Sequence, residues 1–144
     1  MSDAVAPLRE SKAAPITGLV PMIHVADPER SIAFYRLFGF EVGNKVPPEG
    51  PPHWAWLYQP RAANWKHGPN LMVARSECAI EAKEQAVLFY LYAADLVAVR
   101  NRLIAEGVKV SEISHPEYLP EGEFRTADPD GYCLMVAQSG KDTP

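Results

Sequence analysis

The chain has 144 residues, a length that suits one ordinary domain with a single hydrophobic core. Apolar residues make up 47% and charged residues 22%, which is a globular composition, and no apolar run approaches the roughly 20 residues of a membrane span. A net charge of −4 argues against a nucleic-acid partner and favours neutral or cationic small molecules. Two cysteines without CxxC spacing suit a reducing compartment, so we expect a cytoplasmic protein with no membrane partner.

The N-terminal residues mix acids with bases and lack the apolar region of a signal peptide, which predicts a flexible arm over residues 1–16. One domain is expected over 17–139, followed by a short tail at 140–144. Within the domain, we expect a first unit at about 17–78 and a second at about 84–139.

The first unit opens with a largely apolar strand over 18–26. Asp27-Pro28 predicts the start of a helix, because aspartate caps helices and proline suits the first helical position. The helix continues through the apolar side chains of 31–38 and ends at Gly39. Three further strands are expected at 40–46, 53–58 and 71–75.

The second unit shows the same order of elements. A strand is expected over 86–92, and Asp95 precedes a helix that Gly107 ends. The strands expected after that helix are 108–110, 124–127 and 132–138, and a type I turn at Asp128-Pro129-Asp130-Gly131 joins the last two.

Two internal sequence repeats relate the first unit to the second. Leu71-Met72-Val73-Ala74 returns as Leu134-Met135-Val136-Ala137, each time three residues after a glycine, and Asp27 and Asp95 are each followed by a glycine twelve residues later. The offsets are 63 and 68 residues, so one unit is five residues longer than the other. The sequence therefore predicts an α+β fold of two tandem βαβββ modules that form cupped, barrel-like mixed sheets with helices on the outside.

The segments VADPERSIAFYRLFGFEV and TADPDGYCLMVAQ resemble the vicinal oxygen chelate superfamily of glyoxalases, extradiol dioxygenases, and fosfomycin- and bleomycin-resistance proteins. The resemblance covers roughly residues 17 to 139. It implies a fold and not a reaction, because this scaffold hosts isomerases, dioxygenases, thiol transferases and passive drug binders.

In the metal-using members, His and Glu side chains from both units hold one divalent ion in the cup. The resemblance places those four ligand positions at Val20, Met72, Ala86 and Met135, with Leu88 as the alternative to Ala86. None of these side chains is an imidazole or a carboxylate, so we expect no metal and no cofactor. Without a Lewis acid, the chain has no evident means to stabilise an enediolate or to activate dioxygen.

Aromatic side chains at alternating positions of the expected strands suggest that one face of the sheet lines a binding cup. Trp54, Trp56 and Tyr58 share one strand face, and flat or cationic ligands suit aromatic walls. The same rings would also suit a dimer interface. The residues that we expect to bind a ligand are His24, Trp54, Trp56, Met72, Tyr90, Tyr92 and Met135.

The favoured function is metal-independent binding of a small aromatic or cationic organic ligand by a homodimer, as the resemblance to bleomycin-resistance proteins implies. One alternative is an enzyme with a relocated metal held by His24 and by His115 or Glu123. Another is a metal-free lyase or isomerase with His24, the only catalytic candidate, as general base. A third is a non-catalytic domain with a collapsed cavity. The acidic segment 113–123 is interpreted as a solvated surface loop, with a lid over a cationic ligand as the alternative.

Overall fold

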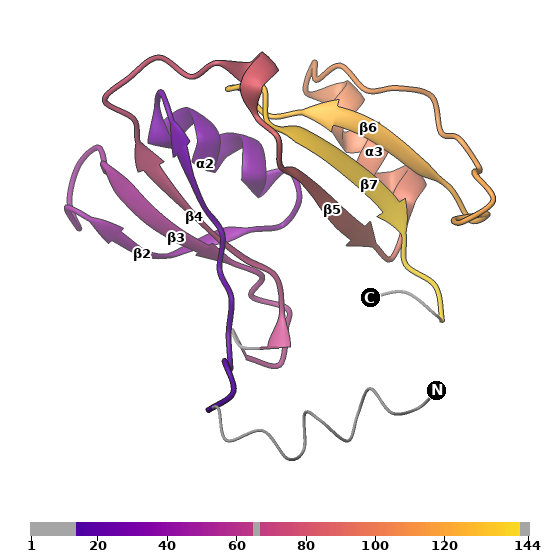
Figure 1. Cartoon of the computed structure of the whole chain (residues 1–144), viewed down its shortest axis with the longest axis horizontal. Helices are drawn as coiled ribbons and strands as arrows, with labels where there is room; N and C mark the ends of the chain where they lie inside the picture. Colours follow the sequence, from indigo (N-terminus) through magenta and orange to yellow (C-terminus); the bar gives the residue numbers. More distant parts are fainter. Residues whose placement is uncertain (1–13, 65–66, 142–144) are drawn as a thin grey trace.

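The computed structural model describes residues 14–64 and 67–141. Most of the N-terminal arm expected at 1–16, and the last residues of the tail, lie outside the described residues. The chain folds into two units that lie side by side, each with one helix against one sheet (Figure 1). The α+β fold expected from the sequence is confirmed. In this part of the chain, no helix is long and apolar enough to cross a membrane.

The first unit contains a four-stranded sheet in the order β1-β4-β3-β2, in which β1 and β4 are parallel and the other pairs antiparallel. Its helix α2 (Pro28–Arg36) begins where the aspartate–proline pair predicts, because the Asp27 carboxylate accepts a hydrogen bond from the Glu29 N–H. The strands are β1 (Met22–Val25), β2 (Glu41–Val46), β3 (Trp54–Tyr58) and β4 (Asn70–Arg75).

The second unit contains a three-stranded sheet in the order β5-β7-β6. Asp95 caps its helix α3 (Leu96–Ala105) by accepting from the Ala98 N–H at 3.0 Å. The strands are β5 (Leu88–Ala93), β6 (Glu123–Ala127) and β7 (Cys133–Gln138), and a short 3₁₀ helix, η3 (Ala82–Glu84), precedes them. Behind this sheet lies α3 (Figure 1).

The prediction of a short strand at 108–110 is wrong, because the structure has no strand there. That segment runs beside β6, but side-chain hydroxyls replace much of the backbone ladder. The Thr126 hydroxyl donates to the Lys109 carbonyl, and the Ser111 hydroxyl accepts from the Arg125 N–H. One isolated bridge joins Ser114 to β6, so the second sheet has three strands where the repeat predicts four.

The repeat itself is confirmed by the strand register. Met22 pairs with Met72 in the first sheet, and Tyr90 pairs with Met135 in the second. These pairs differ by the same 68 and 63 residues that separate the sequence repeats. Each copy of the tetrapeptide therefore forms the central part of an interior strand.

A polar junction ties the two units together. The Tyr35 hydroxyl on α2 donates to the Asp128 carboxylate at 2.7 Å, and the Asp130 carboxylate accepts from the Ala26 N–H at 2.9 Å. The Gly131 N–H donates to the Asp128 carbonyl, which confirms the expected turn. Leu134 of the second unit packs into the core of the first, so apolar contact reinforces the junction.

Candidate functional site

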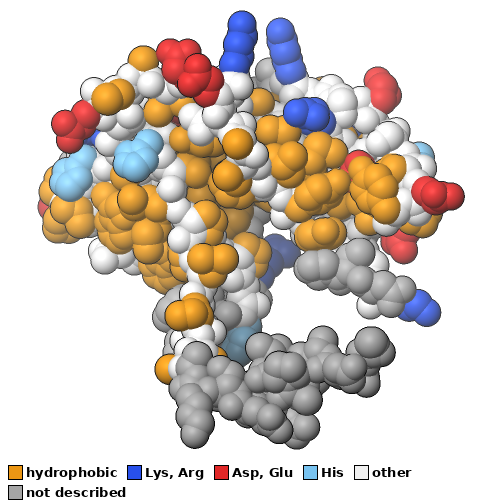
Figure 2. Space-filling model, in the orientation of Figure 1, with side chains coloured by type: hydrophobic (Ala, Val, Ile, Leu, Met, Phe, Trp, Pro, Cys, Tyr) orange, Lys and Arg blue, Asp and Glu red, His pale blue; other side chains and the backbone are white. Residues whose placement is uncertain are grey.

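Each sheet has one face covered and one face open. In β3 the side chains alternate, so that Ala55 and Leu57 are buried while Trp54, Trp56 and Tyr58 lie on the open face. Figure 2, in the orientation of Figure 1, shows hydrophobic side chains gathered over both halves of the molecule with charged side chains towards the rim. A single chain thus leaves two apolar sheet faces exposed.

The repeated tetrapeptide forms the floor of both faces. Its leucine and valine side chains are buried in the core, and its methionine alternates with them towards the open face in both copies; the alanine is half-buried in the first copy and fully buried in the second. Met72 and Met135 occupy the middle of their sheets, and Ala74 and Ala137 lie two residues further along the same strands. The repeated tetrapeptide therefore places the same kind of side chain, a methionine, at the centre of both sheets.

On the first sheet, Ala74 separates two larger side chains. It pairs with His24 on one side and Trp54 on the other, which places those two residues two strand spacings apart, about 10 Å. The His24 side chain is exposed on this face. Its backbone carbonyl accepts a hydrogen bond from the Tyr132 hydroxyl at 2.8 Å, which fixes the strand in place.

The Trp56 ring is held on three sides. It stacks on Tyr58 with a centroid distance of 5.1 Å and an angle of 14° between the planes. Its indole N–H donates to the Asn70 side-chain oxygen at 2.7 Å. A Cβ atom on Gly43 would overlap ring atoms of Trp56, so the indole lies across glycine backbone at this point of β2. The ring is therefore a preformed platform for stacking.

The second sheet carries a matching aromatic pair. Tyr90 and Tyr92 stack at 5.9 Å with 24° between their planes. Across the sheet, Met135 and Arg125 follow Tyr90 in one row. In the neighbouring row, Ala137 lies between Tyr92 and Glu123.

The environment of Glu123 differs from the sequence-based expectation. The sequence predicts a solvated loop at this position, but Glu123 is the first residue of β6 and is buried. Its Oε1 accepts from the Tyr90 hydroxyl and its Oε2 from the Tyr118 hydroxyl, both at 2.7 Å. The hydrogen bond to Glu123 raises the pKa of the Tyr90 hydroxyl above its usual range. The rest of the loop includes exposed groups such as His115, whose Nδ1 lies 2.9 Å from the Pro120 carbonyl oxygen.

Of the positions at which the resemblance places the family's metal ligands, Val20 lines the seam between the units and Ala86 precedes β5. Met72 and Met135 occupy the sheet centres, and Leu88 pairs with Cys133 at the start of β5. Over residues 14–64 and 67–141, no group of three or more His, Cys, Asp or Glu side chains is placed to hold a metal ion. His24 lies on the first sheet, whereas Glu123, one partner considered for a relocated metal, lies on the second.

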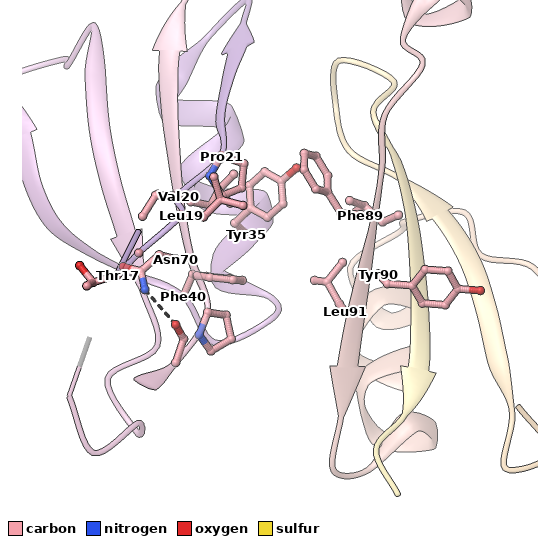
Figure 3. A pocket seen from close by; sticks show the side chains of 15 residues that line it. Thr17, Leu19, Val20, Pro21, Tyr35, Phe40, Asn70, Phe89, Tyr90 and Leu91 are labelled. Carbon is pink, nitrogen blue, oxygen red and sulfur yellow. Dashed lines mark hydrogen bonds between the residues drawn. The ribbon is translucent and has the colours of Figure 1, made fainter. Parts of the chain in front are cut away.

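A pocket of about 380 Å³ lies in the seam between the units. Residues 17–21, Tyr35 and Phe40 line it from the first unit, and Phe89 and Leu91 line it from β5. In Figure 3 Phe89 and Leu91 point from β5 towards the first unit, whereas Tyr90 extends away over the second sheet. Of the expected ligand-binding residues, Tyr90 alone lines this pocket, and no sequence motif marks it.

Solved structures share this fold. A bleomycin-binding protein in complex with bleomycin has a TM-score of 0.66 and 16% identity, and the match covers 87% of this chain and 100% of that chain. TnmS3, an antibiotic-binding protein from Streptomyces sp. CB03234, has a TM-score of 0.64 and 19% identity, over 91% of this chain and 100% of that chain. The fosfomycin resistance protein FosX from Listeria monocytogenes has a TM-score of 0.67 and 13% identity, over 89% and 98%.

No curated protein matched the sequence in a direct comparison. The tandem units, their shared register and the two open faces agree with the family that the sequence motifs suggest. A model of the Glyoxalase/Bleomycin resistance protein/Dioxygenase superfamily matches residues 19–136, and the chain belongs to that superfamily.

Proposed function

We propose that the protein binds a small aromatic organic molecule, without a metal ion, in a cup that a second copy of the chain completes. The observation that carries this proposal is the pair of preformed aromatic stacks, Trp56 with Tyr58 and Tyr90 with Tyr92, on two exposed sheet faces. Flat rings held at fixed angles stack on a flat ligand with little loss of side-chain entropy.

A second copy is needed because one chain leaves these faces uncovered. Leu88 is 46% exposed and Tyr90 is 40% exposed on the second sheet, and Met22 and Val46 are exposed on the first. A two-fold axis would place the first sheet of one copy over the second sheet of its partner. The resulting cup would be lined by aromatic rings from above and below, with Met72 as part of its floor.

Metal independence follows from the chemistry of the side chains at the family's ligand positions. Val20, Met72, Ala86 (or its alternative Leu88) and Met135 offer no imidazole and no carboxylate, and a thioether alone is a poor ligand for the harder divalent ions. Two proteins of similar fold, a bleomycin-binding protein and an antibiotic-binding protein, support binding as the activity.

The test is a titration of the purified protein with flat aromatic compounds, neutral and cationic, followed by calorimetry with and without EDTA. We expect at least one compound to bind with an affinity that EDTA leaves unchanged. Trp56→Ala should weaken that binding by roughly tenfold or more, because it removes the stacking platform. Ile104→Ala, at an exposed position of α3, is the matched control and should bind like the wild type. Loss of binding in EDTA, or equal binding by both variants, would contradict the proposal.

His24 supports a second candidate, a metal-free lyase or isomerase. Its side chain is exposed on the open face, across Ala74 from Trp54, where a general base could reach a bound ligand. If the bound compound is converted, His24→Ala should keep the affinity and lose the turnover. If His24 only contacts the ligand, the variant should lose affinity and no product should form with either protein.

A further inference from the structure

The second sheet contains a buried acidic side chain without a cationic partner. Glu123 is 4% exposed, and within the described part of the chain it forms no ion pair. Arg125 lies two residues along the same strand and is exposed, yet it does not neutralise this carboxylate. A buried charge is costly unless hydrogen bonds and an opposite charge compensate it. Two tyrosine hydroxyls supply the hydrogen bonds here, and no described cation supplies the charge.

The two tyrosines connect this carboxylate to the surface of the cup. Tyr90 is 40% exposed and Tyr118 is 71% exposed, while the carboxylate they share is covered. A hydroxyl that donates to a carboxylate becomes a better acceptor at its own oxygen, because hydrogen bonds in a chain polarise one another. Phenolic oxygens polarised in this way are suited to accept N–H groups from a ligand.

The neighbouring groups favour a cation as well. The stacked faces of Tyr90 and Tyr92 attract a positive charge through their ring electrons. Arg125, in the adjacent row of the described sheet, is the one side chain there whose positive charge would repel a cationic ligand. Because it is exposed, solvent screens that repulsion.

We propose that Glu123, acting through the Tyr90 and Tyr118 hydroxyls, forms a subsite for a protonated amine carried by the aromatic ligand. This inference rests on the proposed function and narrows its ligand class to aromatic compounds with an ammonium group. The carboxylate supplies the charge, and the two hydroxyls supply the contact atoms.

The experiment compares two probes of similar shape, the cationic 2-naphthylmethylamine and the neutral 2-naphthylmethanol, at pH 7 by calorimetry. The wild type should bind the amine roughly tenfold or more tightly than the alcohol, because hydrogen bonds to charged groups are the stronger ones. Glu123→Gln keeps the shape of the side chain and removes its charge, so the two affinities should become equal. Tyr118→Phe, which removes one hydroxyl from an exposed side chain, should lower the ratio without unfolding the protein.

Glu112→Gln is the matched control, because it changes the net charge equally at an exposed carboxylate in an ion pair with Arg100. It should keep the wild-type ratio. An unchanged ratio in Glu123→Gln and Tyr118→Phe overturns the inference while leaving the proposed function intact, provided that the alcohol still binds. Preference for the amine that disappears in Arg125→Ala also overturns it. Failure of the wild type to bind either probe counts against both proposals.

Discussion

Gly43 is the residue on which the shape of the first aromatic platform depends. Its neighbours across the sheet are the Trp56 ring, which a Cβ atom would overlap, and Tyr58, whose Cδ1 would lie 3.1 Å from that atom. The strand register shifts between Val42 and Asn44, so Gly43 sits at an irregularity of β2. Glycine is needed here for a close approach of ring to backbone.

Gly43→Ala should therefore displace the Trp56 ring without opening the core. The expected loss is about 0.5–1.5 kcal/mol of ligand binding, or roughly two- to twelvefold in affinity, because a misplaced ring no longer stacks well. Calorimetry with a probe that the wild type binds measures the loss, and tryptophan fluorescence reports the ring. Gly18→Ala, where an added Cβ meets nothing within 4 Å, should change neither property. Equal fluorescence and equal affinity in all three proteins would show that the ring does not need glycine beneath it.

At the scale of elements, local chemistry made most of the fold predictable. The capping aspartates, the alternation in β3 and the turn before Gly131 are set by contacts within a few residues, and each is found as expected. The segment 108–110 has the composition of a strand, but its pairing is decided by the Ser111 and Thr126 hydroxyls. Side-chain competition of this kind has no periodic signal in the sequence.

The strand faces that carry the candidate residues were predictable to the same degree, whereas their role in ligand binding stays a prediction. Parity along each strand correctly places Trp54, Trp56 and Met72 on one face. The role of Glu123 could not be found from pattern, because Tyr90 comes from another strand and reaches it across β7. Contacts between elements distant in sequence depend on the assembled sheet.

The turn between β6 and β7 provides a titratable contact between the two units. Asp128 accepts hydrogen bonds from the Tyr35 hydroxyl and from the Asp130 and Tyr132 N–H groups. Burial nevertheless raises the pKa of the Asp128 carboxyl, with the nearby Asp130 adding to the shift. The folded chain therefore holds the proton more tightly than the unfolded chain does.

This shift fixes the sign of a pH dependence. The stabilising contribution of Asp128 is fully present below the ordinary aspartate pKa of about 3.9 and is lost as pH rises through the raised pKa. Asp128→Asn resembles the protonated form at every pH. The free energy of unfolding of this variant, relative to the wild type, should rise with pH across that window and then stay level. Urea unfolding between acid and neutral pH measures it.

Tyr35→Phe provides the companion measurement. It removes a donor that lowers the pKa of Asp128, so the window should extend to higher pH when Asp128→Asn is compared in this background. A difference between Asp128→Asn and the wild type that stays constant with pH would show that the charge of this carboxyl is not the cause.

For the whole molecule, the separation of the two aromatic stacks decides how a ligand cup could be assembled. They lie on different sheets, and the seam pocket that joins the two units in one chain contains neither Trp56 nor Tyr92. Monomeric proteins rarely leave large contiguous apolar faces exposed, so such faces indicate contact with a partner. The second copy of this chain is the partner that would bring both stacks into one cup.

A homodimer is therefore expected in solution, and ligand binding should depend on it. Leu88→Glu places a charge on the open face of β5 and should shift the protein to monomer, because an unpaired charge cannot be buried in an apolar interface without several kcal/mol of cost. Val97→Glu changes an aliphatic residue on α3 that is 56% exposed, against 46% for Leu88, and should remain dimeric. Sedimentation velocity separates these outcomes, and calorimetry on the same samples should show that only the monomeric variant has lost its aromatic ligand. A monomeric wild type that still binds ligand would mean that one sheet face is a sufficient site, and the shared cup would have to be abandoned.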